Sequence, residues 1–547
     1  MRLPLISASL LSAASLLAQW TTPYDNTPVH AVNGLDAVTP LSAPGPDGST
    51  YISWFENTVS GYILKMQRLD VGGNALWTAG GLVVSSEQQN SALFRYDLKS
   101  DHAGNAIVAF QDERSGQLDI VAYRMAPDGS MLWGDGLSLP TPGTTGLAPV
   151  IGVLSDDRVV IAWNADATHN VVFRVLPATG MPTAADPTAV PGTGTMGRPR
   201  VIACSDGTFW IQYVVQTGNF LSPGTMTAMR YDGTTPVNGT AITISTKTIA
   251  SFYFPDPISD GHDGLYVAFN TSNATNASIT DVYLQRMRSD GGHWSATGTA
   301  VETNATTQRF TLTATPALVN DDDGLMMAYS RTNLAQDQGG MAVQRFDTAG
   351  TALLGGTGAE LAPLSTDLPG PFGNAPVSDG MVTTYATGGF GQQTLFAWRV
   401  GLDGSISAPG TIQVCTNSSG KDDATLVPFR DGQAVAVWQD GRTASGIYAQ
   451  PITLEDNVGI MEASGTNFQL LGDPGSAPEL LLGGNDPSRE PFTLSIWSME
   501  GRLLERRRLP QANGQRIQVT GKSMAPGIYH VVLERNSERR VLRWVHP

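Results

Sequence analysis

The chain has 547 residues, of which 15% are charged, and it contains 60 Gly and 34 Pro with a net charge of −16 at pH 7. Dense punctuation by glycine and proline is typical of an all-β, turn-rich protein. The acidity disfavours nucleic acid as a partner, because phosphate binding needs clustered lysine and arginine. A soluble, secreted protein accounts for this charge.

Residues 1–19 have the composition of an export sequence. Arg2 precedes an apolar run that extends through Leu17 and ends in small residues near Ala18. This pattern predicts a secretory signal peptide, and the run is too short to favour a membrane span. No later segment is apolar over the length that a spanning helix needs, so we expect a secreted protein and not a transmembrane one.

A unit that recurs eight times dominates the rest of the chain. Each unit holds an Asp-Gly type of turn, a short apolar strand ending in an aromatic residue, a loop, and a strand that carries an arginine in seven of the eight units. The aromatic residues recur at intervals of 50 to 60 positions and are Trp54, Phe110, Trp163, Tyr213, Phe269, Tyr329, Tyr385 and Trp438. Such a period belongs to arrays of small β-sheets, since helical repeats have periods of about 34–47 residues.

The pattern within a unit predicts four antiparallel strands joined by tight turns. The eighth unit lacks its fourth strand, but Trp20 and the apolar segment 29–32 resemble the fourth strand of the first unit. A ring closed by this N-terminal segment would leave no free sheet edge. We therefore predict an eight-bladed β-propeller over residues 20–457, with seven blades as the alternative.

The recurring arginines invite a catalytic interpretation that the repeat itself argues against. They are Arg68, Arg124, Arg174, Arg230, Arg286, Arg345 and Arg399. Because a ring of repeats spreads equivalent residues apart, we predict that they pair with local carboxylates or carbonyl groups. Asp112 with Arg114, and Asp440 with Arg442, follow the aromatics of units two and eight, and we interpret them as loop braces, with binding of sugar hydroxyls as the alternative.

The end of the chain has a different character. Residues 458–491 are rich in Gly, Pro, Asp and Glu and are interpreted as a linker. Strand-like alternation over 492–497, 502–505, 516–519 and 529–533 then predicts a small immunoglobulin-like β-sandwich. We place this domain at residues 492–547, with a start near 466 as the alternative.

This last domain resembles a known family. A Gly-Arg turn at 501–502, a Gly-Ile-Tyr element at 527–529 and a basic-apolar end at 539–542 occur in the order found in the C-terminal sorting domain of type IX secretion cargo in Bacteroidota. The resemblance covers roughly 466–547 and departs at Met524, where the family usually has leucine. It implies that the type IX machinery is a partner, that the protein is secreted or held at the outer-membrane surface, and that the domain is commonly removed. The repeats also look like the propeller-like repeats of such cargo.

Local motifs for catalysis or metal binding do not occur in the sequence. The seven histidines are dispersed, and neither a Gly-x-Ser-x-Gly elbow nor a phosphate-binding loop is present. Asp260 with Asp263, and the run 321–323, would suit calcium, but they occupy the place of an ordinary turn. We therefore predict no metal site and no cofactor. Cys204 and Cys415 fall in different units and are expected to be buried thiols.

Two functions follow from this pattern. The one that we favour from the sequence is a non-catalytic propeller that binds an extracellular glycan or protein, which makes the chain more probably a binding protein than an enzyme. The alternative is a glycan-cleaving propeller whose carboxylates come from different blades. Units four to six have the longest loops between aromatic and arginine, and long loops often carry recognition. We select no catalytic residue. The candidate ligand-binding residues that we select from these loops are Phe220, Asn270, Asn273, Asn276, Arg331 and Asn333.

Overall fold

The structure is a computed structural model in which residues 20–454 are described apart from 33, 90–91, 93–94, 115, 142–144, 167–168, 181–185, 217, 219–223, 238, 250–254, 274–278, 304–307, 311–316, 320–323, 431 and 443. Further along it describes 467–471, 479–483, 492–498, 503–509, 516–519, 527–535 and 538–546. The signal peptide predicted at 1–19 lies outside these residues. The described residues form strands and no helix, which confirms the all-β prediction. The chain divides into two compact units, 1–453 and 454–547.

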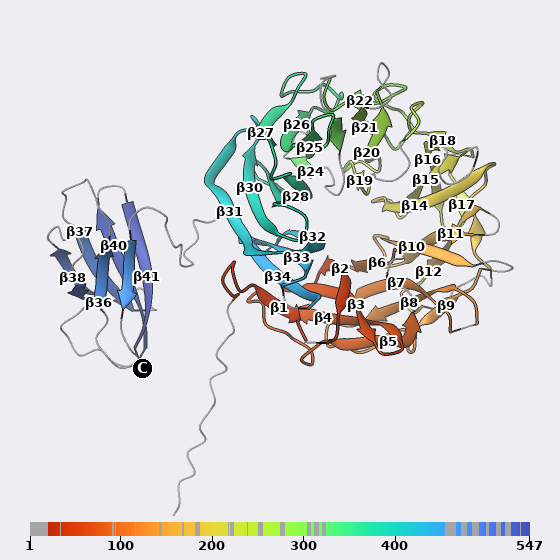
Figure 1. Ribbon diagram of the computed structural model, residues 1–547. Helices are drawn as coiled ribbons and strands as arrows, with labels where there is room; N and C mark the ends of the chain where they lie inside the picture. The colour runs from red at the N-terminus through yellow and green to blue at the C-terminus, as the bar shows by residue number, and fades with distance from the viewer. Residues whose placement is uncertain are drawn as a thin grey trace, which may run out of the picture. The chain divides into compact units, whose positions relative to one another are not determined.

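The first unit contains eight antiparallel sheets among its described residues, and Figure 1 shows them following one another around a ring. Sheet 1 consists of β2 (Ala37–Pro44), β3 (Thr50–Thr58), β4 (Gly61–Leu69) and β5 (Leu82–Gln89), and sheet 2 of β6 (Asp97–Ser100), β7 (Ala106–Asp112), β8 (Asp119–Met125) and β9 (Leu137–Leu139). Sheet 3 consists of β10 (Gly146–Val153), β11 (Val159–Ala165), β12 (Asn170–Leu176) and β13 (Thr188–Ala189), and sheet 4 of β14 (Thr195–Ala203), β15 (Phe209–Gln216), β16 (Gly224–Asp232), β17 (Thr235–Pro236) and β18 (Ile242–Thr243).

Sheets 5 to 8 complete the ring. Sheet 5 consists of β19 (Ile258–Ser259), β20 (Leu265–Ser272), β21 (Thr280–Met287) and β22 (Thr299–Ala300), and sheet 6 of β23 (Gln308–Phe310), β24 (Ala317–Val319), β25 (Gly324–Thr332), β26 (Gly339–Phe346) and β27 (Ala359–Ser365). Sheet 7 consists of β28 (Gly370–Val377), β29 (Gly380–Thr387), β30 (Gln393–Gly401) and β31 (Ile406–Ser419), and sheet 8 of β32 (Lys421–Arg430), β33 (Gln433–Asp440) and β34 (Gly446–Thr453) together with β1 (Thr27–His30).

The ring has a centre and two faces that follow from the strand order. The first strands of most neighbouring sheets contact one another, so these strands surround the centre. Loops from second to third strands, and the connections from one sheet to the next, lie on one face, because the strands are antiparallel. We call this the loop face. The remaining hairpins lie on the opposite face, the turn face.

The N-terminal segment closes the ring. β1 pairs with β34 as the outermost strand of sheet 8, at residues 27–30 and not at the predicted 29–32. The indole Nε1 of Trp20 donates to the carbonyl oxygen of Val71 in sheet 1 at 2.8 Å. Trp77 and Trp133 make the same bond to the sheets that follow them, at 3.0 Å each. Trp20 and β1 therefore supply the fourth-strand contacts that unit eight lacks.

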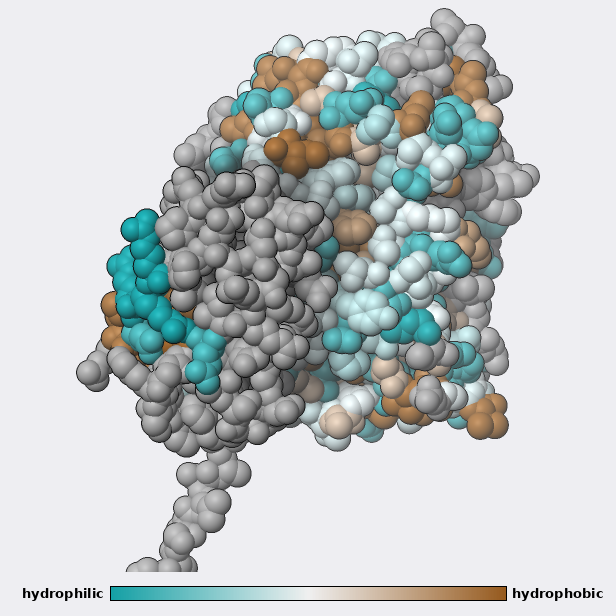
Figure 2. Space-filling model, turned by 60° about the vertical axis from the view of Figure 1, so that its left-hand side comes forward, coloured by the Kyte–Doolittle hydropathy of each residue, from teal (hydrophilic) through white to brown (hydrophobic). Residues whose placement is uncertain are grey.

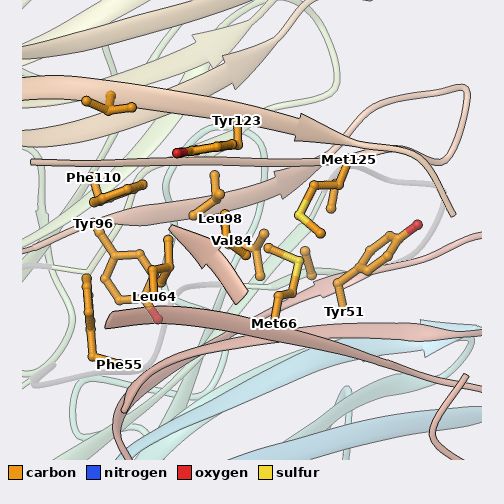
Figure 3. Close-up of a cluster of buried hydrophobic side chains, with 14 of the residues drawn as sticks. Tyr51, Phe55, Leu64, Met66, Val84, Tyr96, Leu98, Phe110, Tyr123 and Met125 are labelled. Atoms are coloured by element: carbon orange, nitrogen blue, oxygen red, sulfur yellow. The ribbon is translucent and has the colours of Figure 1, made fainter. Parts of the chain in front are cut away.

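The core lies between neighbouring sheets, and the periodic aromatic residues are part of it. None of the eight is more than 6% exposed. Figure 3 shows the cluster between sheets 1 and 2, where the ring of Phe55 packs edge-on against Tyr96 and Phe110 at centroid distances of 5.0 and 6.4 Å. Large, rigid side chains at this place fix the spacing of the sheets.

The periodic arginines tie the turn face together. Arg230 pairs with Asp206 and Arg286 with Asp260, each at 2.9 Å, within one sheet. Arg230 also donates to the carbonyl of Ser289 in the next sheet at 3.2 Å. Arg68 and Arg124 reach carbonyl groups of the following sheets in the same way. These contacts agree with the predicted structural pairing and do not converge on one point.

A buried charge network braces the loop face of sheet 8. The fully buried carboxylate of Asp440 accepts hydrogen bonds from Trp438 at 2.8 Å and Ser419 at 2.7 Å. It also pairs with Arg442 at 2.6 Å and Lys421 at 3.1 Å. Desolvation alone would raise the pKa of Asp440, but these bonds and the charge of Lys421 outweigh it and lower the pKa to about 2.

The same brace holds the N-terminal segment. The guanidinium of Arg442 donates to the carbonyl oxygens of Tyr24 at 3.1 Å and Asp25 at 2.8 Å, and to Oδ1 of Asn26 at 2.9 Å. Asp112 and Arg114 form the corresponding pair in sheet 2 at 2.6 Å. Both pairs are therefore loop braces, as interpreted from the sequence.

The second unit contains two sheets among its described residues. They are β35 (Asn467–Leu471), β36 (Glu479–Gly483) and β39 (Arg516–Gln518), and β38 (Leu503–Leu509), β37 (Phe492–Ser498), β40 (Gly527–Arg535) and β41 (Glu538–His546). β35 and β36 lie inside 458–491, so the linker prediction is corrected for these ten residues. Leucines at 480–482 favour a strand despite the surrounding glycines, and the alternative start near 466 fits better. The turn at 501–502 and Met524 lie outside the described residues.

Trp163→Ala should lower the free energy of unfolding by about 3–5 kcal/mol, because it removes a fully buried side chain between sheets 2 and 3. Leu132→Ala, at a side chain that is 49% exposed, is the matched control and should change it by no more than about 0.5 kcal/mol. Thermal and denaturant unfolding of both variants measure this. Equal effects of the two changes would refute the packing role of Trp163.

Acid should destabilise the first unit through Asp440. The pKa of Asp440 is about 2 in the folded protein, which is below its value in the unfolded chain. The ionised carboxylate therefore stabilises the fold fully at a pH above the unfolded-state pKa, and this stabilisation is lost as the pH falls through the folded-state pKa. The loss should reach about 2 kcal/mol between pH 5 and pH 2. Unfolding midpoints over this range should depend less on pH in Asp440→Asn, and identical slopes for variant and wild type would contradict the assignment.

Candidate functional site

The inner strands of five sheets carry a bulge at the loop face, where the pairing register shifts in β2, β10, β14, β28 and β32. In four of these bulges a residue other than glycine has positive φ, namely Thr39 at 51°, Ala148 at 53°, Arg198 at 56° and Asp423 at 46°. Such backbone costs on the order of 1 kcal/mol or more, and it clusters at functional sites.

Contacts between sheets hold these bulges in place. In three of them, the backbone N–H of the bulge residue donates to an amide side chain that follows the periodic aromatic of the preceding sheet. The pairs are Thr39 with Gln439 at 3.1 Å, Ala148 with Gln111 at 3.3 Å, and Arg198 with Asn164 at 3.0 Å. The repeat therefore places strained backbone at the loop face of sheets 1, 3, 4 and 8.

An ion cluster connects inner segments that are not neighbours in the ring. Arg95 lies just before β6 in sheet 2, and Asp256 lies just before β19 in sheet 5. The Arg95 guanidinium donates to both carboxylate oxygens of Asp256, at 3.0 and 3.1 Å. Arg200, in β14 of sheet 4, binds the same carboxylate. The triad therefore joins the inner segments of sheets 2, 4 and 5 at the loop face.

The electrostatics of the triad keep Asp256 ionised. Desolvation would raise the pKa of its carboxyl group, but the charges of Arg200, Arg95 and Lys99 lower it well below its ordinary value. Lys99 also lies 3.5 Å from the carboxylate of Asp97. Desolvation, together with repulsion from Arg95, lowers the pKa of Arg200.

A second aspartate near the same centre has the opposite tendency. Asp423 is the bulge residue of β32, and desolvation and the neighbouring charge of Asp422 raise its pKa. Its charge acts on Tyr96, the residue that follows Arg95. The Tyr96 hydroxyl donates to the carbonyl of Thr39 at 2.7 Å, which fixes the segment that carries Arg95. The loop face therefore holds one aspartate whose pKa is lowered and one whose pKa is raised.

Two of the residues selected from the sequence, Phe220 and Asn276, are outside the described residues. Asn273 and Asn333 donate to partners in their own loops, Asp281 at 2.8 Å and Asp337 at 2.6 Å. Asn270 is buried in β20, and Arg331 pairs at 2.9 Å with Glu302, which follows β22 of the preceding sheet. None of these partners belongs to the triad at the ring centre.

The cluster at the ring centre leaves no local signal in the sequence. Arg95, Arg200, Asp256 and Asp423 belong to no motif, and Arg95 and Asp256 are 161 positions apart. One feature could have indicated the site: Arg200 and Asp423 are charged residues on first strands, whereas the first strands β2, β10 and β28 carry no charged residue.

The remaining chemistry of the described residues is sparse. Cys204 and Cys415 are buried free thiols, as predicted. No group of three or more His, Cys, Asp or Glu is placed to hold a metal ion within the described part of the chain. Nor does any described helix have the length and apolarity to cross a membrane. Val59 and Phe390 are exposed at loop tips, and Figure 2 shows apolar and polar side chains intermixed over the described residues of the face it presents.

Comparison with known proteins gives structural similarity only. No family model and no curated protein match the sequence. A solved polysaccharide lyase is similar with a TM-score of 0.41 and 10% identity, covering 69% of this chain and 94% of that one. A family PL25 ulvan lyase has the same score and identity over 79% and 96%. A thermostable family-43 glycoside hydrolase has a TM-score of 0.30 and 15% identity over 51% and 98%.

The similar solved structures are polysaccharide lyases and glycoside hydrolases, which runs against the expectation that the chain is a binding protein more than an enzyme. That expectation treated the absence of a local motif as the absence of a site. A ring assembles groups from distant repeats, so its site leaves no local motif. At these identities and TM-scores the similarity assigns no reaction, and the function proposed below is built on the chain's own residues.

Asp423→Gly should keep or raise the thermal midpoint, because glycine adopts a φ of 46° without steric cost. Asp423→Val should lower the stability by about 1–2 kcal/mol, since a β-branched residue tolerates this region poorly. Asp422→Val, at the adjacent exposed position without positive φ, is the matched control and should change stability little. Thermal unfolding that ranks Asp423→Val equal to Asp422→Val would show that the bulge is not strained.

Proposed function

We propose that the chain is an extracellular glycan-cleaving enzyme whose site lies at the centre of the loop face. The single observation that carries this proposal is the pair of aspartates, Asp256 and Asp423, on different sheets at the same face, with pKa values displaced in opposite directions. Pairs of carboxyl groups with separated pKa values are how acid and base roles are assigned in glycan hydrolysis.

The roles follow from the charge state of each group. Asp423, whose pKa is raised, is suited to protonate the oxygen of the scissile glycosidic bond. Asp256, which Arg95 and Arg200 hold ionised, is suited to act as the base that activates water or as the nucleophile. Tyr96 is a positioning residue, because its buried hydroxyl is bonded to the bulge of sheet 1 and its backbone leads directly to Arg95.

The finer architecture and the route of export belong to the same proposal. The eight sheets are the blades of an eight-bladed β-propeller, with β1 completing the last blade, and the second unit is an immunoglobulin-like sorting domain. The signal-peptide pattern and the C-terminal resemblance support export by type IX secretion to the cell surface or the medium. Mass spectrometry of exported protein should find residues 1–19 and much of 466–547 removed, and an intact C-terminus at Pro547 would contradict the removal.

The catalytic proposal is tested with the full chain and a panel of neutral and acidic polysaccharides. Formation of new chain ends should be detected for at least one of them, and Asp423→Asn and Asp256→Asn should each lower the rate about 100-fold or more. Asp128→Asn, at an aspartate of the turn face, should leave the rate unchanged. Cleavage that survives both site changes would remove these residues from the mechanism, and wild-type protein that cleaves nothing in the panel would refute catalysis.

The pH profile of cleavage gives a second test. Activity should fall as the pH rises through the raised pKa of Asp423, because the acid must be protonated, and it should persist at low pH because the pKa of Asp256 is lowered. Replacement of the neighbouring carboxylate by Asp422→Asn should shift the alkaline limb to lower pH, since that carboxylate raises the pKa of Asp423. An unchanged alkaline limb would separate Asp423 from the acid step.

A further inference from the structure

The centre of the loop face concentrates positive charge in a protein whose net charge is −16. Arg95 and Arg200 both bind the carboxylate of Asp256, and the positive charge of Lys99 also attracts that carboxylate. A second carboxylate, that of Asp97, lies beside Lys99; it is buried and accepts the backbone N–H of Ile151 at 2.8 Å. Among these described groups, three cations therefore face two carboxylates.

The cluster is open to solvent in part and electrostatically unbalanced. The side chains of Arg95, Lys99 and Asp256 are 37%, 47% and 42% exposed, whereas that of Arg200 is 11% exposed. Repulsion from Arg95 acts on the charge of Arg200. A further anion placed between these cations would relieve that repulsion and balance the charge of the cluster.

We propose that Arg95, Lys99 and Arg200 bind an anionic group of the sugar substrate, a uronate carboxylate or a sulfate ester, at the centre of the loop face. This inference rests on the proposed glycan-cleaving function and names its substrate class. A guanidinium presents paired N–H groups in the geometry of a carboxylate or sulfate, so Arg95 and Arg200 supply orientation as well as charge.

The position of the cluster explains how binding would serve the reaction. Arg95 and Arg200 already bind the carboxylate of Asp256, so an anionic sugar held by the same guanidinium groups lies beside Asp256. Tyr96 ties Arg95 to the bulge of sheet 1, which limits its movement. A neutral sugar would leave the excess positive charge unbalanced, and the site would therefore discriminate against it.

The test measures binding in the full-length Asp423→Asn background, so that cleavage does not interfere. Polygalacturonate supplies carboxylates, dextran sulfate supplies sulfate esters, and dextran is the neutral counterpart; isothermal titration gives each affinity. We expect at least one polyanion to bind, and we expect the affinity for dextran to be lower by about 10-fold or by a larger factor. Arg95→Gln and Arg200→Gln should each weaken polyanion binding by about 10-fold to 100-fold, the range expected for a charge-assisted hydrogen bond.

Controls separate this site from general charge. Arg399→Gln removes an arginine of the turn face that pairs with Asp379 at 2.6 Å, and it should leave binding unchanged. Arg95→Lys keeps the charge and should weaken binding less than Arg95→Gln. Thermal midpoints report whether each variant is folded, and a misfolded Arg200→Gln is replaced by Arg200→Lys, which should lose the paired hydrogen bonds and part of the affinity.

The outcomes are distinct. Preference for polygalacturonate or for dextran sulfate supports the proposal and identifies the anion. Equal affinity for dextran and both polyanions, or wild-type polyanion affinity in the folded Arg95 and Arg200 variants, overturns it. The wild-type protein could bind polyanions through these arginines and yet cleave nothing, which would refute the catalytic function and leave this inference standing. Cleavage confined to neutral glycans would refute this inference and leave the catalytic function standing.

Discussion

Closure of the ring is the constraint on which the rest of the structure depends. Arg95 and Asp256 belong to sheets 2 and 5, and no strand pairing connects those sheets directly. Their contact at 3.0 Å is possible only if every sheet between and around them holds its place. The bond from Trp20 to sheet 1 and the pairing of β1 with β34 close the circle and so fix the distances across its centre.

Two kinds of contact hold neighbouring sheets together, one on each face of the ring. On the turn face, the periodic arginines bind carbonyl groups of the following sheet, and these contacts repeat around the ring. On the loop face, Gln439, Gln111 and Asn164 hold strained bulges of the following sheet. The turn face is therefore regular and structural, whereas strain and unbalanced charge gather on the loop face, which is the usual arrangement of a site on a rigid scaffold.

Much of the fold could be predicted from the sequence because the repeat is local. The interval between aromatics, the Asp-Gly turns and the missing fourth strand of unit eight gave the strand order, and the eight sheets and β1 agree with them. The exceptions also have local causes: β1 begins two residues earlier than predicted, and leucines at 480–482 form a strand where glycine and proline suggested a linker.

The candidate site could not be predicted in the same way. Asp256 and Asp423 matter through what the ring brings near them. Asp423 lies 15 positions before Trp438, as the other three bulge residues do before their own aromatics, but these four positions share no residue type that would mark a site. Loop length directed attention to Asn273 and Asn333, yet both close their own loops. A more useful criterion is the strand nearest the centre, where a charged residue costs stability unless it is paired or functional. Arg200 and Asp423 meet that criterion from sequence position once the strand order is known, because the first strand of each unit must face the centre of a closed ring.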